Sequence, residues 1–68
     1  MDDLEAIGRN IARLRTKKKL SQEDLCGTAD IDRSYLSEIE NGHKNFSITV
    51  LLKIARALEV APEDILKI

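Results

Sequence analysis

The strongest constraint on the fold is a pair of helix-start signals placed close together in the middle of the chain. Ser21 offers a hydroxyl N-cap, and the acidic Asp24 follows three residues later, a pattern that opens helices. Asp32 offers a second N-cap soon afterwards. Gly27 lies between the two signals, so the first helix must be short. The sequence therefore predicts two short helices joined by a tight turn.

Apolar residues at steps of three and four predict the other helices. The expected helices run from about Asp3 to Lys18, from Gln22 toward Ala29, from about Arg33 to Glu40, from Ile48 to Leu58, and from Pro62 through Ile65, Leu66 and Ile68. No alternating run predicts a strand. We therefore expect an all-α fold, a compact five-helix domain formed by residues 1–68.

The composition is that of a small soluble protein with one small core, so stability has to come from well-packed helices or from association. No apolar run approaches the roughly 18 residues of a membrane span. The acidic start lacks the basic and apolar segments of a secretory signal, so we expect a cytoplasmic protein without a membrane partner. Cys26 and His43 are single, which excludes an internal disulfide and the usual zinc site. We expect no metal and no cofactor.

The net charge of −1 does not favour nucleic-acid binding, but the charges are unevenly distributed. More than half of the basic residues lie in one stretch, whose members are Arg9, Arg13, Arg15, Lys17, Lys18 and Lys19. Half of the twelve acidic residues lie near the two ends of the chain. We expect an electrically two-sided molecule. The lysine run either attracts polyanions at long range or forms a solvated loop.

The segment QEDLCGTADIDRSYLSEI, residues 22–39, resembles the helix-turn-helix of the phage-repressor and Cro-like family. The positions by which that family packs its two helices are here Leu25, Ala29, Ile31, Leu36 and Ile39, and Cys26 takes the small position where the helices touch. The similarity continues through residues 40–42 and through LLKIARALEV, residues 51–60. The resemblance implies a repressor-like domain that binds double-stranded DNA with its third helix.

Two residues depart from the family pattern. Asp30 stands where the family has a turn glycine, and aspartate tolerates a positive φ better than most residues. Glu59 stands where a glycine commonly ends the fourth helix, so that end is either built differently or strained. The stretches IDRSYLSEIE and ALEVAPEDI are similar to the controller proteins of restriction–modification systems, which are dimeric autoregulators.

The exposed face of the third helix follows from its buried face. Leu36 and Ile39 mark the inner side, and at 100° per residue Ser34, Ser37 and Glu38 point the other way, with Arg33 and Tyr35 on the flanks. The first turn of a recognition helix reaches the base edges, where an arginine can pair with guanine. We expect base contacts from Arg33, Ser34, Tyr35 and Ser37. The alternatives are a solvated or phosphate-bound Arg33, a Tyr35 that leans on the scaffold, and a Glu38 that is solvated instead of reading cytosine.

Phosphate contacts are expected on both sides of that helix. The start of the second helix at Ser21 and Gln22 favours a phosphate through its backbone N–H groups. The family resemblance implies further contacts from the segment after the third helix, from Asn41, His43, Lys44 and Asn45. The alternatives are that Ser21 acts as an N-cap alone and that Asn41 acts as a helix terminator alone.

The resemblance also implies an ion pair between Arg15 and Glu40 that orients the recognition helix. Separately, the C-terminal part of the chain has more apolar residues than so short a core needs. We expect a homodimer interface formed by Val50, Ile54, Ile65, Leu66 and Ile68. The alternative is that these residues close the core of the monomer.

Two function hypotheses follow. The first is a sequence-specific transcription regulator that binds a pseudo-palindromic operator as a homodimer. The second is a protein-interaction or oligomerisation module, or an antitoxin, with the same fold. An enzyme is not expected, because one cysteine, one histidine and three glycines build neither a nucleophile constellation nor a phosphate loop. No small-molecule substrate is evident.

Overall fold

The computed structural model describes residues 2–68, which form five helices and no strand. The helices are α1 (Asp3–Lys17), α2 (Gln22–Ala29), α3 (Arg33–Glu40), α4 (Ile48–Leu58) and α5 (Pro62–Ile65). The all-α prediction is confirmed. One boundary is wrong: α5 ends at Ile65, so Leu66 and Ile68 lie beyond the last helix. None of the helices among residues 2–68 is both long and apolar enough to cross a bilayer.

Local capping accounts for the helix starts. The hydroxyl of Ser21 accepts from the amide of Asp24 at 3.0 Å, and the Asp24 carboxylate accepts from the amide of Ser21 at 2.9 Å. Asp32 caps α3 by accepting from two backbone amides, and Ser47 caps α4. Each bond joins residues two or three apart, which is why the sequence signals identified these starts.

Three residues other than glycine have a left-handed backbone. Asp30 ends α2 with φ 57°, as expected at the family's glycine position. Glu59 ends α4 with φ 57°, so this end has the usual glycine geometry and its side chain makes it strained. Lys19 has φ 60° in the turn between α1 and α2, where no glycine in the sequence marks the left-handed position.

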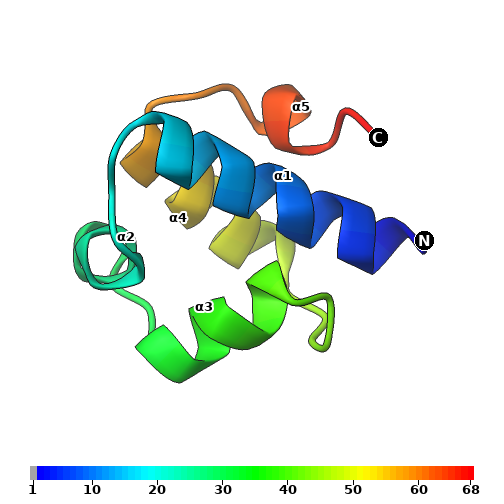
Figure 1. The fold of residues 1–68 in the computed structure, drawn as a ribbon, viewed down its shortest axis with the longest axis horizontal. Coiled ribbons are helices and arrows are strands. Elements are labelled where there is room, and N and C mark those ends of the chain that lie inside the picture. The colour runs from blue at the N-terminus through cyan, green and yellow to red at the C-terminus, as the bar shows by residue number, and fades with distance from the viewer. Residues whose placement is uncertain (1) are drawn as a thin grey trace.

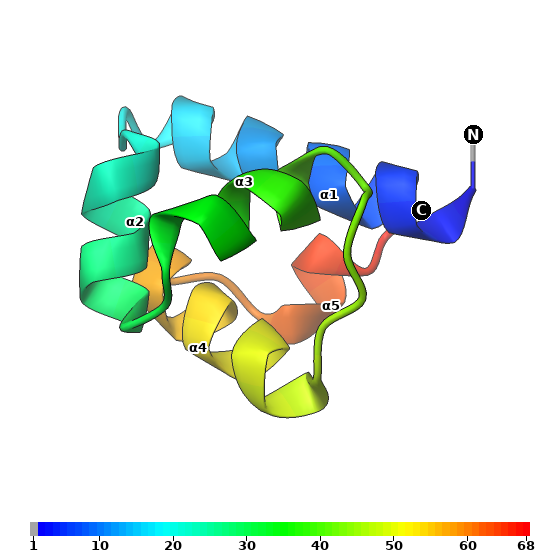
Figure 2. The same ribbon diagram turned by 90° about the horizontal axis from the view of Figure 1, so that it is seen from below.

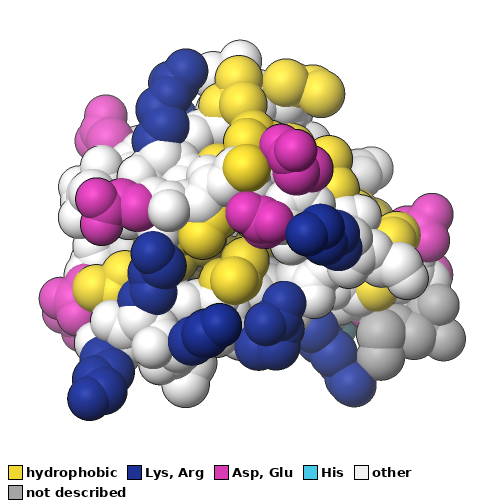
Figure 3. All heavy atoms as spheres, turned by 90° about the horizontal axis from the view of Figure 1, so that it is seen from above, with side chains coloured by type: hydrophobic (Ala, Val, Ile, Leu, Met, Phe, Trp, Pro, Cys, Tyr) yellow, Lys and Arg dark blue, Asp and Glu magenta, His cyan; other side chains and the backbone are white. Residues whose placement is uncertain are grey.

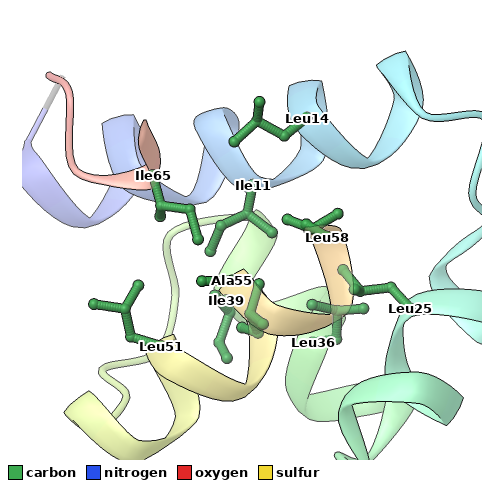
Figure 4. Close-up of a cluster of buried hydrophobic side chains, with 10 residues drawn as sticks. Ile11, Leu14, Leu25, Leu36, Ile39, Leu51, Ala55, Leu58 and Ile65 are labelled. Atoms are coloured by element: carbon green, nitrogen blue, oxygen red, sulfur yellow. The ribbon is translucent and has the colours of Figure 1, made fainter. Parts of the chain in front are cut away.

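All five helices contribute to one core. In Figure 1, α1 and α5 lie on one side of the molecule and α3 on the other, with α2 and α4 between them, and Figure 2 shows the same arrangement from below. The close-up in Figure 4 shows the core side chains converging from these elements. The core consists of Ile11, Leu14, Leu25, Leu36, Ile39, Leu51, Ile54, Ala55, Leu58 and Ile65.

The position of α3 depends on a close approach to α1 at Gly8. A Cβ atom built at Gly8 would overlap the carbonyl oxygen of Ile39 and lie 2.8 Å from that of Glu40. Only glycine therefore fits where α1 crosses the C-terminal end of α3. On another side of α1, the Asn10 side-chain amide donates to the carbonyl oxygens of Ile65 at 3.0 Å and Lys67 at 2.7 Å, which holds the C-terminal segment.

Candidate nucleic-acid interface

The start of α3 and the start of α2 together form a shallow polar groove. Gln22, Arg33, Ser34 and Ser37 line it, and its volume is about 260 Å³. Arg33 and Ser34 are exposed, and Ser37 is half-buried. The structure thus brings together three of the four residues expected to contact bases. It presents them on one surface that a ligand can approach from solvent.

Tyr35, the fourth of these residues, lies apart from the groove. Its ring is half-buried against the core, and its hydroxyl donates to the carbonyl oxygen of Asn45 at 3.3 Å. The side chain therefore links α3 to the loop that follows it. This arrangement favours the scaffold alternative for Tyr35, because the ring already has its partners within the chain.

The charged side chains around α3 differ in whether they have an ion-pair partner. Arg33 belongs to none of the ion pairs within residues 2–68, and its guanidinium is open to solvent. Lys44 lies 3.7 Å from the carboxylate of Glu38, with both side chains about half exposed. Glu38 is therefore a solvated residue that faces a lysine, which agrees with the solvated interpretation. Arg33 is the cation at the recognition face that is left without a protein partner.

A hydrogen-bonded ion pair holds the C-terminal end of α3. Arg15 donates to Glu40 twice, from Nε to Oε2 at 2.7 Å and from Nη2 to Oε1 at 3.1 Å. A third donor, Nη1, reaches the carbonyl oxygen of Leu20 at 2.8 Å. The hydrogen bond to Glu40 raises the pKa of Arg15 above its ordinary value, although partial burial opposes the shift. The Glu40 side chain is only 6% exposed, so this pair ties α1 to the recognition helix inside the fold.

Gln22 is part of the same network. Its side-chain Nε2 donates to Glu40 Oε1 at 3.0 Å, so the start of α2 is tied to the end of α3. One N–H of the Gln22 amide is therefore used within the chain, and the second N–H remains for the phosphate contact expected at the start of α2. Ser21 caps α2, which agrees with its interpretation as an N-cap.

The segment after α3 is an exposed polar loop. Asn41 is the C-cap of α3, and Gly42 turns the chain with φ 76°. A Cβ at Gly42 would approach Glu5 of α1 to 2.7 Å, so the loop packs closely against the start of the first helix. His43, Lys44 and Asn45 are all exposed beyond this turn. The loop is therefore anchored at its base and presents polar side chains to solvent.

The expected dimer interface is wrong in two of its five residues. Ile54 and Ile65 are 0% exposed in the monomer, where they fill the core, so they have no surface to offer a second copy. Val50 is half-buried, whereas Leu66 is 45% and Ile68 65% exposed. Ile48 is 71% exposed, although it fits the apolar spacing of its helix. It is the first residue of α4, so its side chain extends past the edge of the core.

Two of these exposed residues, Ile48 and Leu66, line an apolar groove between the start of α1, the start of α4 and the C-terminal segment. Its volume is about 200 Å³, and its lining consists of Leu4, Ile7, Phe46, Ser47, Ile48, Leu51 and Leu66. The groove is formed by residues from separate elements, and the spacing of apolar residues within one helix does not show that these elements meet. No signal within a single helix indicates it.

Known proteins share this architecture. The helix-turn-helix family matches residues 11–65. The chain is 40% identical over 61 residues to the control protein C.BamHI of Bacillus amyloliquefaciens, covering 88% of this chain and 75% of that protein. It is 37% identical over 67 residues to the control protein C.MunI of a Mycoplasma species, covering 96% and 90%.

Among solved structures, the restriction–modification controller protein C.AhdI of Aeromonas hydrophila superposes with a TM-score of 0.91 at 41% identity, covering 93% of this chain and 96% of that one. The helix pair that forms the polar groove lies within the matched region. The chain therefore belongs to the helix-turn-helix family of DNA-binding transcription regulators.

Proposed function

We propose that this protein is a dimeric controller that works in the bacterial cytoplasm, where it binds a pseudo-palindromic operator and regulates a restriction–modification gene set that includes its own gene. The observation that supports DNA reading most directly is the exposed groove lined by Arg33, Ser34 and Ser37. The similar relatives named as control proteins support the regulatory role. Each α3 would enter a major groove, the two sites lying about 34–36 Å apart.

Arg33 is the proposed base reader. It occupies the first turn of α3, and it has no acid partner within residues 2–68. A bidentate contact with guanine discriminates against a wrong base by about 1–3 kcal/mol. The Arg15–Glu40–Gln22 network supports this role, because it fixes α3 relative to α1 and α2 and so limits the entropy lost when DNA binds.

The loop after α3 is the proposed phosphate clamp. Lys44 is its one lysine, and its contact with Glu38 is long and exposed, so exchange for a phosphate costs little. Asn41, His43 and Asn45 can add hydrogen bonds to phosphate oxygens. Such contacts set the register of the protein on DNA and carry no sequence information.

The proposed homodimer uses the exposed apolar surface formed by Ile48, Leu66 and Ile68. These are the large hydrophobic side chains that stay exposed in residues 2–68, and two of them, Ile48 and Leu66, line the apolar groove. A second copy related by a two-fold axis would cover the same surface on both protomers. We revise the interface accordingly, keeping Val50, Leu66 and Ile68 and adding Ile48.

The decisive experiment titrates the protein onto DNA from upstream of its own gene and onto a scrambled duplex, each at two salt concentrations. Arg33→Ala should narrow the affinity gap between the two duplexes, whereas Lys44→Ala should weaken both equally. Arg56→Ala, which removes an exposed arginine from α4, is the control. Equal affinity of the wild type for both duplexes would contradict the proposal and favour a protein-interaction module.

The dimer is tested by sedimentation of Ile48→Asp. A buried, unpaired carboxylate at a two-fold interface should shift the protein to the monomer. Thr49→Asp, at the exposed neighbouring position of α4, is the matched control and should stay dimeric. A variant of Ile48 that sediments as the wild type does would rule out this surface.

A further inference from the structure

The strongest unexplained feature of the molecule is a basic groove on the side away from α3. It lies between the C-terminal half of α1 and the segment around α5, and its volume is about 560 Å³. Arg13, Lys17, Lys18 and Lys67 line it, against one acidic residue, Asp64. Figure 3 looks onto the α1 and α5 side and shows Lys and Arg side chains in a row along that face.

These cations are available to a ligand. Arg13, Lys17 and Lys18 are exposed, and none of them takes part in the ion pairs of residues 2–68. Asp64 lies 3.3 Å from Lys67 and also accepts from the backbone amide of Ala61, so it is engaged by its own segment. The groove therefore retains an excess of unpaired positive charge.

The orientation of α1 separates this groove from the recognition helix. Gly8 and Arg15 face α3, as the close approach and the ion pair show. At 100° per residue, Arg13 lies about 140° around the helix from Gly8, and Lys17 about 180°. A duplex seated on α3 therefore leaves the basic groove exposed on the far side (Figure 1).

The recognition side itself is poor in positive charge. The exposed acids of α2, α3 and their caps are Glu23, Asp24, Asp30, Asp32 and Glu38, against Arg33 in the same segment. Sequence-independent affinity for DNA comes from neutralising phosphates with Lys and Arg. Apart from Lys44 in the loop after α3, most of the exposed cations able to do so lie on the α1 side instead.

We propose that the basic groove of α1 and α5 is a second, sequence-independent binding surface for duplex DNA. Arg9, Arg13 and Lys17 recur every fourth residue, a row of about 12 Å along which one DNA strand places about three phosphates. A protein bound to its operator by α3 can thus hold another DNA segment on its opposite side. This bridging rests on the proposed operator binding, whereas binding by the groove alone does not.

The test immobilises operator duplex, saturates it with protein, and then adds a labelled scrambled duplex at low salt. The wild type should capture the label, and Arg13→Gln/Lys17→Gln should bind the operator normally and lose the capture. The same double variant should reduce the slope of log affinity against log salt for scrambled duplex by about 1.8, at 0.9 for each lost phosphate contact. Lys53→Gln/Arg56→Gln removes the same charge from α4 and should behave as the wild type.

The outcomes separate the two proposals. Protein that fails to bind the immobilised operator contradicts the proposed function. If the wild type binds the operator normally but does not capture the labelled duplex, the proposed second surface is wrong. It is also wrong if the α4 control loses capture to the same extent as Arg13→Gln/Lys17→Gln. If poly-glutamate binds the groove while scrambled duplex does not, the groove accepts acidic protein and the DNA proposal is wrong.

Discussion

Gly8→Ala tests the close approach of α1 to α3. The new Cβ would overlap the carbonyl oxygen of Ile39 and lie 2.8 Å from that of Glu40, where ordinary contact begins at 3.4 Å. Both obstacles are backbone atoms, so the two helices must move apart. Gly27 provides the matched control, because it is also helical and a Cβ there meets nothing within 4 Å.

The magnitude follows from two opposing effects. Alanine is favoured over glycine in a helix interior by about 0.8–1.0 kcal/mol. Gly27→Ala should therefore raise the free energy of unfolding by nearly that amount. At Gly8 the same gain is outweighed by overpacking, which costs about 1–3 kcal/mol in a well-packed site. We expect a net loss of up to about 2 kcal/mol, toward the upper end because the displaced segment includes Glu40, the partner of Arg15.

The assay is thermal unfolding followed by circular dichroism. Protein concentration is held constant, because dimerisation makes the midpoint concentration-dependent. For a chain of this size, about 1 kcal/mol corresponds to 4–8 °C in Tm. Gly27→Ala should melt above the wild type and Gly8→Ala below it. A Gly8→Ala protein as stable as Gly27→Ala would refute the close packing of α1 on α3.

Three further predictions concern a strained residue, the ion pair and a cap. Glu59→Gly should raise Tm, because glycine adopts the left-handed φ of 57° without a Cβ penalty of about 1 kcal/mol. Arg15→Met should lower the free energy of unfolding by about 2–4 kcal/mol by leaving Glu40 buried and unpaired, and Arg15→Met/Glu40→Met should recover part of it in a double-mutant cycle. The hydrogen bond from the Ser21 amide lowers the pKa of Asp24 below its ordinary value. The stabilisation from the Asp24 carboxylate is therefore fully present above the ordinary pKa and is lost as the pH falls through the lower pKa of the folded state. Asp24→Asn should reduce the loss of stability that urea titrations show below about pH 4.

Helix starts and the helix-turn-helix were predictable because their causes are local. The caps at Ser21, Asp32 and Ser47 join residues two or three apart, and the periodicity of the core is written within each helix. The exposed face of α3, with Arg33 and Ser34, followed from the same periodicity. Glu59 illustrates a weaker case: the sequence indicated an unusual helix end but left open whether that end is built differently or is strained.

The assignment of apolar residues to core or surface was decided only by the tertiary structure. Ile54 and Ile65 are buried and Ile48 is exposed, although all three fit the apolar pattern of their helices, because burial depends on what packs across from each position. The engagement of Gln22 by Glu40 likewise joins residues eighteen apart.

The sequence by itself determined five helices, the turn between the second and third, and a cluster of basic residues, since each depends on near neighbours in the chain. Only the packed structure determined where that cluster points. Close contact through Gly8 and the pair of Arg15 with Glu40 turns one side of α1 toward α3. The rotation of a rigid helix then carries Arg13 and Lys17 to the opposite side of the molecule.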